Sequence, residues 1–344
     1  MTKRTTLKDI ARETGVHVST VSRALDPQKR SSLTDEVVRK IKSTADRLGY
    51  RPNRIAFSLR KQKTMTIGVM IPDITNMIFP AIVRGIESVM EPLGYASIIV
   101  NTDGDSAREK RLLETLQDRG VDGIIHTAVL RSDPTIVEAA RQGLPVVTLN
   151  RKVEEADIPY VINDEESGIR KVFDLLYCSG HRKIAHLAGP RDLSTGLLRR
   201  QAFCAVARDY GFEENSLVVE EAQRFDEREG RRCAKAILER APETTAILCA
   251  NDRLGLGAID QCNSIGRPCP ESISITGFND MALLDHIPPG LTTIRIEQFE
   301  AGATAARLLA RILDGNGDSV PRETILPVSL TLRNSVGTVA DAQL

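Results

Sequence analysis

The chain has 344 residues, with 46 Lys and Arg against 46 Asp and Glu, so its formal net charge at pH 7 is zero. This length is too great for one compact domain and predicts two or three. No run of 18 apolar residues occurs, and the basic N-terminal residues precede no apolar signal segment. We therefore expect a cytoplasmic protein without a membrane partner. The six scattered cysteines lack metal-ligand spacing, which predicts free thiols and no metal site.

The charges are unevenly distributed along the chain. Residues 1–64 contain 16 Lys and Arg and 6 Asp and Glu, a balance of +10, whereas the remaining residues contain 30 basic and 40 acidic residues, a balance of −10. A small basic segment ahead of an acidic body indicates a polyanionic partner such as nucleic acid. The alternative is a solubilising surface without a specific partner, and charge alone does not separate the two.

The first helix is predicted from its capping residues. Thr6 and Asp9 have the spacing of a capping box, in which the hydroxyl and the carboxylate satisfy free amides at the start of a helix. Ile10 and Ala11 then fall on one face of the helix. Gly15 should end it, because glycine tolerates the positive φ that a helix C-terminus often needs.

The stretch "VHVSTVSRAL", residues 16–25, predicts a second helix from about His17 to Leu25. Two short helices joined by a tight turn containing glycine form a helix-turn-helix unit. A helix that enters the major groove needs a slim outer face. This one offers small hydroxyls and Arg23, which can form two hydrogen bonds to guanine. The alternative is a surface helix of an ordinary three-helix bundle.

A third helix is predicted to follow Thr34, its expected N-cap, with Ile41 and Ala45 facing the core and Gly49 at its end. Pro52 then begins the segment "PNRIAFSLRKQKT", which is long enough for about two helical turns. A helix this short is marginal in water, so we expect it to fold only against a partner.

The stretches "TLKDIARETGVHVSTVSRAL" and "RLGYRPNRIAFSLR" closely resemble the DNA-binding head and hinge of the LacI/GalR family of bacterial repressors. The resemblance implies base contacts for Val18, Ser19 and Arg23 in the major groove. It also implies that paired hinge helices enter the minor groove, where a leucine at the place of Leu59 wedges between bases. The full set that the resemblance assigns to DNA is Thr6, His17, Val18, Ser19, Thr20, Ser22, Arg23, Asn53, Arg54, Leu59 and Arg60.

From Met65 onward, short apolar β-branched runs alternate with amphipathic helical stretches, beginning with "TIGVMIP" at residues 66–72. This alternation predicts parallel sheets covered by helices on both faces. The pattern restarts near "KIAHLAGP", which suggests two similar α/β halves forming two lobes with a cleft between them. The predicted fold is therefore α/β: an all-α helix-turn-helix head and a two-lobed body similar to periplasmic sugar-binding proteins. The predicted domains are residues 1–51 (head), 52–64 (hinge) and 65–340 (effector binding and dimerisation).

Ligands of open α/β sheets bind outside the carboxyl ends of the strands, so polar side chains at strand ends are candidates for a binding site. Any one of them is more often a cap or a loop contact than a ligand contact. Taken together and matched to the family, they resemble its effector pocket: Asn76, Phe79, Asn150, Arg151, Arg199, Phe225, Asn251 and Asn279. Aromatic rings stack on sugars, while amides and guanidiniums bind hydroxyls and acids.

The pocket departs from the family pattern, because sugar-binding relatives often have Asp where Asn150 and Asn279 stand and Gln near Ile296. Arg151 and Arg199 would then lack those two carboxylates and leave the cleft locally positive. The sequence therefore suggests a sugar or sugar derivative, including the anionic hypothesis of a sugar acid or sugar phosphate. Asp73 or Asp280 could still neutralise the two arginines.

The predicted function is sequence-specific DNA binding by a transcriptional regulator, most simply a repressor, whose operator affinity is switched by this effector. Partners would be double-stranded DNA with a near-palindromic operator, the effector and a second copy of the chain in a homodimer. No cofactor and no catalytic residue is expected, since no nucleophile arrangement or paired acid and base is found. The alternatives are a ligand-binding protein with a vestigial head and a sugar-modifying enzyme.

Overall fold

The computed structural model describes residues 5–25, 33–50, 63–154 and 156–339. The chain forms two compact units, which we describe separately. Met1–Thr64 contains the predicted head and hinge, and Met65–Leu344 is the body. The segment predicted as a hinge lies almost entirely outside the described residues, and so do its predicted contact residues Asn53, Arg54, Leu59 and Arg60.

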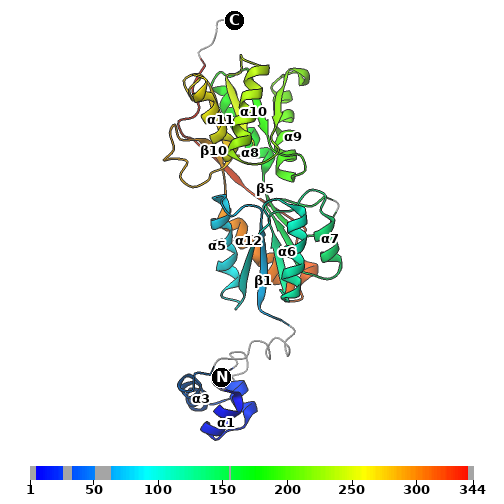
Figure 1. Ribbon diagram of the computed structural model, residues 1–344, viewed down its shortest axis with the longest axis vertical. Coiled ribbons are helices and arrows are strands. Elements are labelled where there is room, and N and C mark those ends of the chain that lie inside the picture. The colour runs from blue at the N-terminus through cyan, green and yellow to red at the C-terminus, as the bar shows by residue number, and fades with distance from the viewer. Residues whose placement is uncertain (1–4, 26–32, 51–62, 155, 340–344) are drawn as a thin grey trace. The chain divides into compact units, whose positions relative to one another are not determined.

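The head contains the three predicted helices, α1 (Leu7–Thr14), α2 (Val18–Leu25) and α3 (Asp35–Arg47) (Figure 1). The capping box at the start of α1 is confirmed, because the Asp9 amide donates to the Thr6 hydroxyl and the Asp9 carboxylate accepts from the Thr6 amide. Gly15 ends α1 in the left-handed region with φ 70°. Thr34 occupies the N-cap of α3, but without the side-chain hydrogen bond that caps usually make.

The three helices of the head pack around a small apolar core whose buried members are Ile10, Ala11, Val21, Ala24, Ile41 and Ala45. The small Ala11 and Ala24 let the first two helices approach closely across the turn at Gly15. Because this core takes up one side of α2, the opposite side remains available for a partner.

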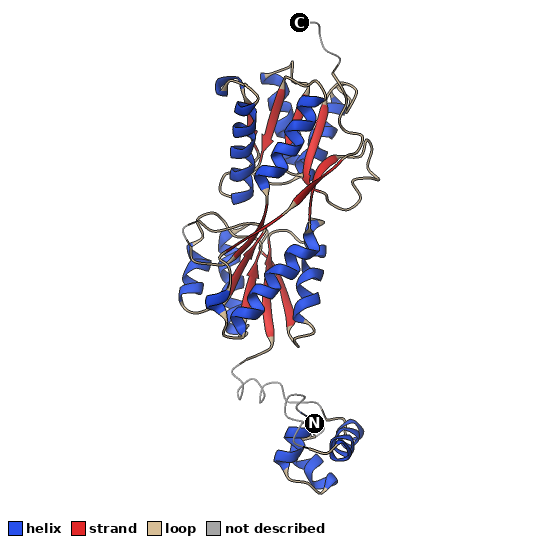
Figure 2. Cartoon of the chain, turned by 180° about the vertical axis from the view of Figure 1, so that it is seen from behind, coloured by secondary structure: helices blue, strands red, loops and turns tan. Residues whose placement is uncertain are grey.

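Each lobe of the body contains a six-stranded sheet (Figure 2). In lobe 1 all strands are parallel, in the order β11-β5-β4-β3-β1-β2. These strands are β1 (Thr66–Ile71), β2 (Ala96–Asn101), β3 (Gly123–His126), β4 (Val146–Leu149), β5 (Tyr160–Asn163) and β11 (Glu323–Leu326). The helices of lobe 1 are α5 (Ile78–Met90), α6 (Ser106–Asp118), α7 (Pro134–Arg141) and α12 (Gln298–Leu313), followed by the short η3 (Gly317–Ser319).

Lobe 2 has the order β12-β10-β9-β8-β6-β7, with β12 antiparallel to β10 and the other neighbours parallel. Its strands are β6 (Ile184–Ala188), β7 (Val218–Glu221), β8 (Ala246–Cys249), β9 (Ser274–Asn279), β10 (Thr292–Ile296) and β12 (Val328–Thr331). Its helices are α8 (Glu165–Cys178), α9 (Ser194–Asp209), η2 (Glu214–Ser216), α10 (Glu227–Arg240) and α11 (Asp252–Ser264).

The lobes are not two consecutive halves of the sequence, which corrects the simple repeat that the sequence suggests. The chain passes between the lobes at residues 163–165, 296–298 and 326–328. In sequence, α12 and β11 of lobe 1 therefore lie between β10 and β12 of lobe 2. The predicted parallel sheets with helices on both faces are confirmed (Figure 2). The three segments that cross between the lobes are the points about which the lobes can move relative to each other.

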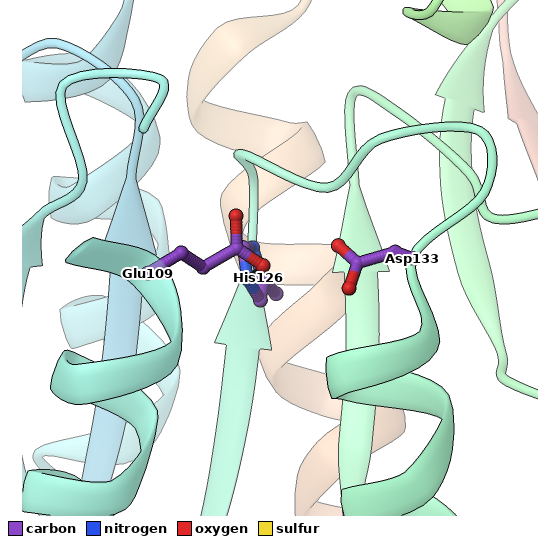
Figure 3. Close-up of side chains that lie close together, drawn as sticks. All are labelled: Glu109, His126 and Asp133. Carbon is purple, nitrogen blue, oxygen red and sulfur yellow. Dashed lines mark hydrogen bonds and ion pairs between the residues drawn. The ribbon is translucent and has the colours of Figure 1, made fainter. Parts of the chain in front are cut away.

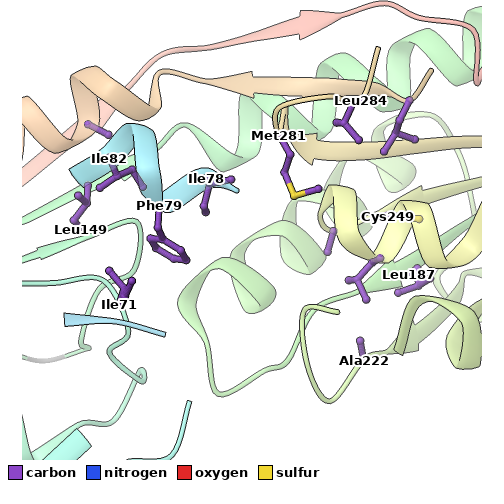
Figure 4. Packing of buried hydrophobic residues seen from close by; sticks show 14 of the residues in the cluster. Ile71, Ile78, Phe79, Ile82, Leu149, Leu187, Ala222, Cys249, Met281 and Leu284 are labelled. Carbon is purple, nitrogen blue, oxygen red and sulfur yellow. The ribbon is translucent and has the colours of Figure 1, made fainter. Parts of the chain in front are cut away.

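One apolar cluster contains side chains of both lobes (Figure 4). Ile71 and Phe79 belong to lobe 1, and Leu187 and Cys249 belong to lobe 2. All six cysteines are free, as the sequence predicts. Within the described residues, no helix is both long and apolar enough to cross a membrane.

The pair of helices α5 and α12 is held together by glycines that have no room for a side chain. A Cβ atom at Gly302 would lie 2.0 Å from the Ile82 carbonyl oxygen, and one at Gly85 would lie 2.0 Å from the Phe299 carbonyl oxygen. Since the obstacle in both cases is backbone, only a shift of the helices could accommodate a larger residue.

We expect Gly302→Ala to lower the free energy of unfolding by about 1–3 kcal/mol, although alanine favours helices over glycine. Urea unfolding followed by circular dichroism measures this change. Gly317→Ala is the matched control, because its nearest neighbouring atom lies 4.0 Å from the added Cβ. Equal stability of the Gly302 variant and the wild type would contradict the close approach.

Candidate functional site

The body contains a cavity of about 470 Å³ between its two lobes. Its walls come from the segments that follow the carboxyl ends of β1, β2, β3 and β4 in lobe 1 and of β6 and β7 in lobe 2, together with the first turn of α11. This position agrees with the strand-end rule used on the sequence. The lining residues are Pro72, Asp73, Asn76, Asp103, Gly104, Ser106, Glu109, Ala128, Leu130, Arg151, Pro190, Asp192, Leu193, Gln223, Arg224, Phe225, Asp226 and Arg253.

Of the eight residues predicted for the pocket, Asn76, Arg151 and Phe225 line the cavity. Asn76 follows β1, and Phe225 follows β7 on the opposite lobe, so the two can contact one ligand from different sides. Phe225 also lies against Gly189, where an added Cβ would come within 2.3 Å of the ring. A glycine is therefore needed to let this ring reach the wall of the cavity.

The other five predicted residues do not border the cavity, and local structure accounts for three of them. Phe79 is 2% exposed and packs into the apolar core. Asn251 is the N-cap of α11, where its side-chain oxygen accepts from the Leu254 amide. Asn150 has a positive φ of 66°, and its side-chain oxygen accepts from Asn163 at 3.4 Å. Caps and left-handed turns are common uses of asparagine at strand ends.

Arg199 and Asn279, the remaining two, lie together behind the cavity. Arg199 is 2% exposed, and its Nε donates to the Glu165 carboxylate at 2.5 Å. A second guanidinium nitrogen donates to the Ala250 carbonyl at 2.6 Å, and the guanidinium carbon lies 3.7 Å from the centre of the Phe278 ring. Asn279 accepts from Arg199 at 3.5 Å. Every side of this guanidinium is engaged within the protein.

Glu165 overturns the expected positive charge around Arg199. Burial raises the pKa of the Glu165 carboxyl, while the charge and hydrogen bonds of Arg199 oppose that rise. The lining of the cavity itself contains five carboxylates (Asp73, Asp103, Glu109, Asp192 and Asp226) against three guanidiniums (Arg151, Arg224 and Arg253). The cleft is thus not locally positive, and the anionic-effector hypothesis loses its main support.

Arg151 differs from Arg199 because no described residue places a carboxylate within hydrogen-bond distance of it. Its Nη1 donates to the Ala128 carbonyl at 3.2 Å, and its buried Nε has no hydrogen-bond partner among the described residues. Burial lowers the pKa of Arg151 to about 10, which still leaves the guanidinium charged at neutral pH. A buried donor without a protein partner is costly, which makes Arg151 a candidate contact for a ligand in the cavity that it borders.

An ion pair connects the two lobes at the rim of the cavity. Arg253 of lobe 2 donates to Asp73 of lobe 1 at 2.7 Å and also forms two hydrogen bonds to Glu227. Burial alone would raise the pKa of Asp73, but hydrogen bonds from Thr75 and from Arg253 lower it. Asp73, which the sequence offered to the pocket arginines, therefore neutralises an arginine that the sequence did not single out.

Backbone contacts join the lobes a short distance away. The Lys152 amide donates to the Ser194 hydroxyl at 3.0 Å, and the Arg131 amide donates to the Asp192 carbonyl at 2.9 Å. These contacts lie on loops that follow strands of opposite lobes. Closure of the body therefore brings together groups that line the cavity or adjoin it.

A buried acidic cluster lies beside the cavity in lobe 1, where Glu109 of α6, His126 of β3 and Asp133 before α7 point toward one another (Figure 3). The Ala128 amide donates to His126 Nδ1 at 3.1 Å, which places the ring proton on Nε2, 3.1 Å from Glu109. A metal ion would have to displace that proton, so the arrangement favours proton sharing over metal binding.

The two carboxyls of this cluster differ in their preferred charge. Burial and the negative charge of Glu109 raise the pKa of Asp133 to about 6. Burial also acts to raise the pKa of Glu109, but hydrogen bonds from His126 and Asp133 leave it below its ordinary value. As the pH rises, Glu109 therefore ionises before Asp133, and Glu109 is the member that lines the cavity.

The sequence had indicated Asp73 as a strand-end residue but not Asp103, Glu109, Asp192, Gln223, Arg224, Asp226 or Arg253. Asp103 and Asp192 follow β2 and β6 within four residues, so the strand-end rule could have found them. Glu109 lies in the first turn of α6, and Arg253 lies in the first turn of α11. Only the packing of those helices against the sheets brings them to the cavity.

In the head, Ser19 and Arg23 of α2 are exposed, as is His17 directly before it, while Val18, Thr20 and Ser22 are half-buried. Thr6 is used by the capping box, where its hydroxyl donates to Asp9 at 2.7 Å. Ser19 and Arg23, four residues apart, share one face of a helix that is packed on its other side, which is the arrangement needed for insertion into a groove.

Two sequence profiles of known families match the chain. The profile described as bacterial regulatory proteins of the lacI family matches residues 6–53, and that of periplasmic binding proteins and the sugar binding domain of the LacI family matches residues 64–334. The ribose operon repressor of Halalkalibacterium halodurans is 30% identical over 96% of this chain and 97% of its own. Catabolite control protein A of Priestia megaterium is also 30% identical, over 96% of this chain and 98% of its own.

Solved structures are similar over the same length. A crystal structure of the lac repressor dimer bound to operator and the anti-inducer ONPF has a TM-score of 0.85 and 26% identity, covering 98% of this chain and 100% of that one. A LacI family regulator from Enterococcus faecium with bound ribose has a TM-score of 0.70 and 30% identity, covering 80% of this chain and 100% of that one.

Because Arg151 and Arg199 lie in different environments, we expect substitutions at the two residues to have different effects. Arg199→Met should lower the free energy of unfolding by about 3–5 kcal/mol, because it leaves the buried Glu165 without a counter-charge. Arg170→Met is the matched control, since its ion pair with Asp209 is exposed to solvent and should contribute little to stability. Chemical denaturation measures both, and equal effects would contradict a structural role for Arg199.

The buried carboxyl of Asp252 should make the stability of the protein depend on pH. Burial raises the pKa of its carboxyl to about 7, although the Thr293 hydroxyl and the Met281 amide donate to it. A carboxyl whose pKa is raised by folding is bound to a proton more often in the folded state, so its contribution to stability falls as pH rises from about 4 to 7.

We expect Asp252→Asn to remove this fall. The uncharged Asn side chain can accept from the Met281 amide through its oxygen and donate to the Thr293 hydroxyl through its nitrogen. Between pH 5 and pH 8 the wild type should lose about 2–3 kcal/mol more stability than the variant for a shift of this size. Denaturation midpoints at several pH values measure the difference. Parallel pH profiles for the two proteins would show that Asp252 does not titrate in this range.

Proposed function

The chain belongs to the LacI family of bacterial regulatory proteins and is a DNA-binding transcriptional regulator; from that premise, we propose that a small molecule in the inter-lobe cavity sets its affinity for an operator. The observation that carries the proposal is the composition of the cavity wall. Asp73 of lobe 1 and Arg253 of lobe 2 both line the cavity and pair with each other. A ligand that competes for either group changes how firmly the lobes are held together.

The strength of this contact suits a switch. An ion pair of partly exposed groups stabilises by about 1 kcal/mol, which a few hydrogen bonds to a ligand can match. A ligand shifts an equilibrium between two conformations only by its difference in affinity for them. A ligand whose hydroxyls contact Asn76 of lobe 1 and whose ring stacks on Phe225 of lobe 2 would meet that condition, since only one lobe spacing allows both contacts.

We propose a neutral sugar as the effector class. Carboxylates accept hydrogen bonds from sugar hydroxyls, and the lining carries more carboxylates than guanidiniums. Arg151 supplies donors to a ring or hydroxyl oxygen. Asn76, Arg151 and Phe225 would contact the ligand, with Phe79, Asn150, Arg199, Asn251 and Asn279 supporting the wall from behind. The similar regulators whose descriptions mention ribose fit this class of ligand.

On the DNA side, we propose that the domain of residues 1–51 reads the operator through α2 and that residues 52–64 transmit lobe movement to it. The balance of +10 over residues 1–64 favours binding to phosphates. The operator would be a near-palindrome bound by a homodimer in the bacterial cytoplasm, because a two-fold protein matches a two-fold site. Leu59 and its neighbours stay assigned to the minor groove as a proposal.

An apolar surface on lobe 1 supports the homodimer. It consists of Ile74 (62% exposed), Met77 (43%) and Ile99 (42%). Ile99 lies on β2, the edge strand of the sheet, and Ile74 is tied to the end of that strand by a hydrogen bond from its amide to the Asn101 side chain. Exposed apolar residues on an unpaired edge are unfavourable unless another surface covers them.

The proposed function is tested in two steps with the full chain. Random DNA is first enriched for binding, and the account predicts an inverted repeat. Sugars and their acid and phosphate derivatives are then screened by thermal shift, and each hit is titrated into a gel-shift assay with that operator. A neutral sugar that changes operator affinity supports the proposal, whereas tighter binding of the anionic derivative would contradict the ligand class.

Variants of two arginines distinguish a loss of ligand binding from a general effect of removing an arginine. Arg151→Met should weaken ligand binding by about tenfold or more, because it removes the donor at the buried position. Arg111→Met, an exposed residue of α6, is the matched control and should bind as the wild type does. Unchanged ligand affinity in the Arg151 variant would contradict the pocket.

The dimer surface gives a further prediction. Ile99→Lys should shift the protein toward monomers, measured by analytical ultracentrifugation, because a charge would be buried against the partner. Leu332→Lys, at an exposed apolar residue of lobe 2, is the control (65% exposed). Dissociation by the control but not by Ile99→Lys would place the interface elsewhere.

A further inference from the structure

His17 lies directly before α2, where its carbonyl accepts from the Thr20 amide at 2.9 Å, as an N-cap residue does. Its imidazole contacts the next turn at two points. The Ser19 amide donates to His17 Nδ1 at 3.2 Å, and the Ser19 hydroxyl lies 2.8 Å from the same nitrogen. Both side chains are exposed, and Ser19 lies on the face of α2 that is proposed to meet DNA.

The two contacts together determine where the protons are. A backbone amide can only donate, so His17 Nδ1 must present its lone pair and the ring proton must be on Nε2. With no proton on Nδ1, the 2.8 Å contact is a hydrogen bond only if the Ser19 hydroxyl donates to the ring. The hydroxyl proton is then directed at His17, and only the oxygen lone pairs face outward.

We propose that His17 fixes the hydrogen-bonding polarity of Ser19, so that Ser19 offers DNA an acceptor and selects a base with an exocyclic amino group. In the major groove adenine presents N6 and cytosine presents N4 as donors, whereas guanine O6 and thymine O4 are acceptors. Phosphate oxygens are also acceptors, so the hydroxyl is poorly suited to them while His17 holds its proton. The inference rests on the proposed function, in which α2 reads base edges.

A purely structural role for His17 predicts something different. If the ring serves only as an N-cap, another capping residue should replace it without changing which base is preferred. His17→Ser makes this distinction, because serine is itself a favoured N-cap but has no ring to take the Ser19 proton. In this variant the Ser19 hydroxyl can turn to donate or to accept.

The experiment enriches random DNA with the full-length wild type, Ser19→Ala and His17→Ser. The position whose preference disappears in Ser19→Ala identifies the base that Ser19 contacts. We expect the wild type to prefer adenine or cytosine there by about three- to tenfold, the range of a single hydrogen bond, and His17→Ser to lose most of that preference while keeping the rest of the operator. Circular dichroism confirms that the variants retain their helices.

A base analogue tests the amino group directly. 2-Aminopurine in place of adenine, or 2-pyrimidinone in place of cytosine, removes the donor from the major groove at this position. Wild-type binding should weaken about three- to tenfold, and His17→Ser binding should change less than about twofold.

Three results would overturn the inference: a wild-type preference for guanine or thymine at the Ser19 position, the same base preference in His17→Ser, or no position affected by Ser19→Ala. Each of them leaves the proposed operator binding intact. Failure of the wild type to enrich any inverted repeat would instead remove the proposed function, and this inference with it.

Discussion

The ion pair between Asp73 and Arg253 is the interaction on which the account of the body depends. It joins the lobes at the wall of the cavity that they form, and Glu227 holds the arginine in place from its own lobe. Because both partners border the cavity, the same two side chains hold the lobes together and form part of the cavity wall. A contact of this strength holds the lobes without locking them.

The two arginines predicted for the pocket show how burial separates structure from binding. Arg199 has its charge balanced by Glu165 and its remaining donors engaged by backbone, so it supports the wall of lobe 2. Arg151 has a buried nitrogen without a partner among the described residues and stands at the cavity surface. Arg199 thus contributes to stability, whereas Arg151 is the arginine proposed to contact the ligand.

The head was predictable almost to the residue, because its signals are local. The capping box of Thr6 and Asp9 and the positive φ of Gly15 need no information from elsewhere in the chain. The strands at residues 66–71 and 184–188 were equally clear, since buried parallel strands are continuous apolar runs. The edge strands β11 and β12 were not identified, because their exposed residues interrupt such runs.

The site was predictable only in part, because a strand end specifies a level in the sheet but not which side chain faces the cavity. Asn251 and Phe79 lie at that level and are used by a cap and by the core. The partner of Arg199 could not be predicted from the sequence, since Glu165 is 34 residues away and belongs to a helix after the crossing between lobes. Contacts of this kind depend on the tertiary fold.

The most direct measurement of the central claim is the ligand dissociation constant of the full chain with and without saturating operator DNA. If one lobe arrangement serves both partners, thermodynamic linkage requires DNA to change the ligand affinity by the same factor by which the ligand changes the DNA affinity. We expect a matched change of about fivefold or more, the lower end of typical coupling. Identical ligand affinities for the free and the DNA-bound protein would contradict it.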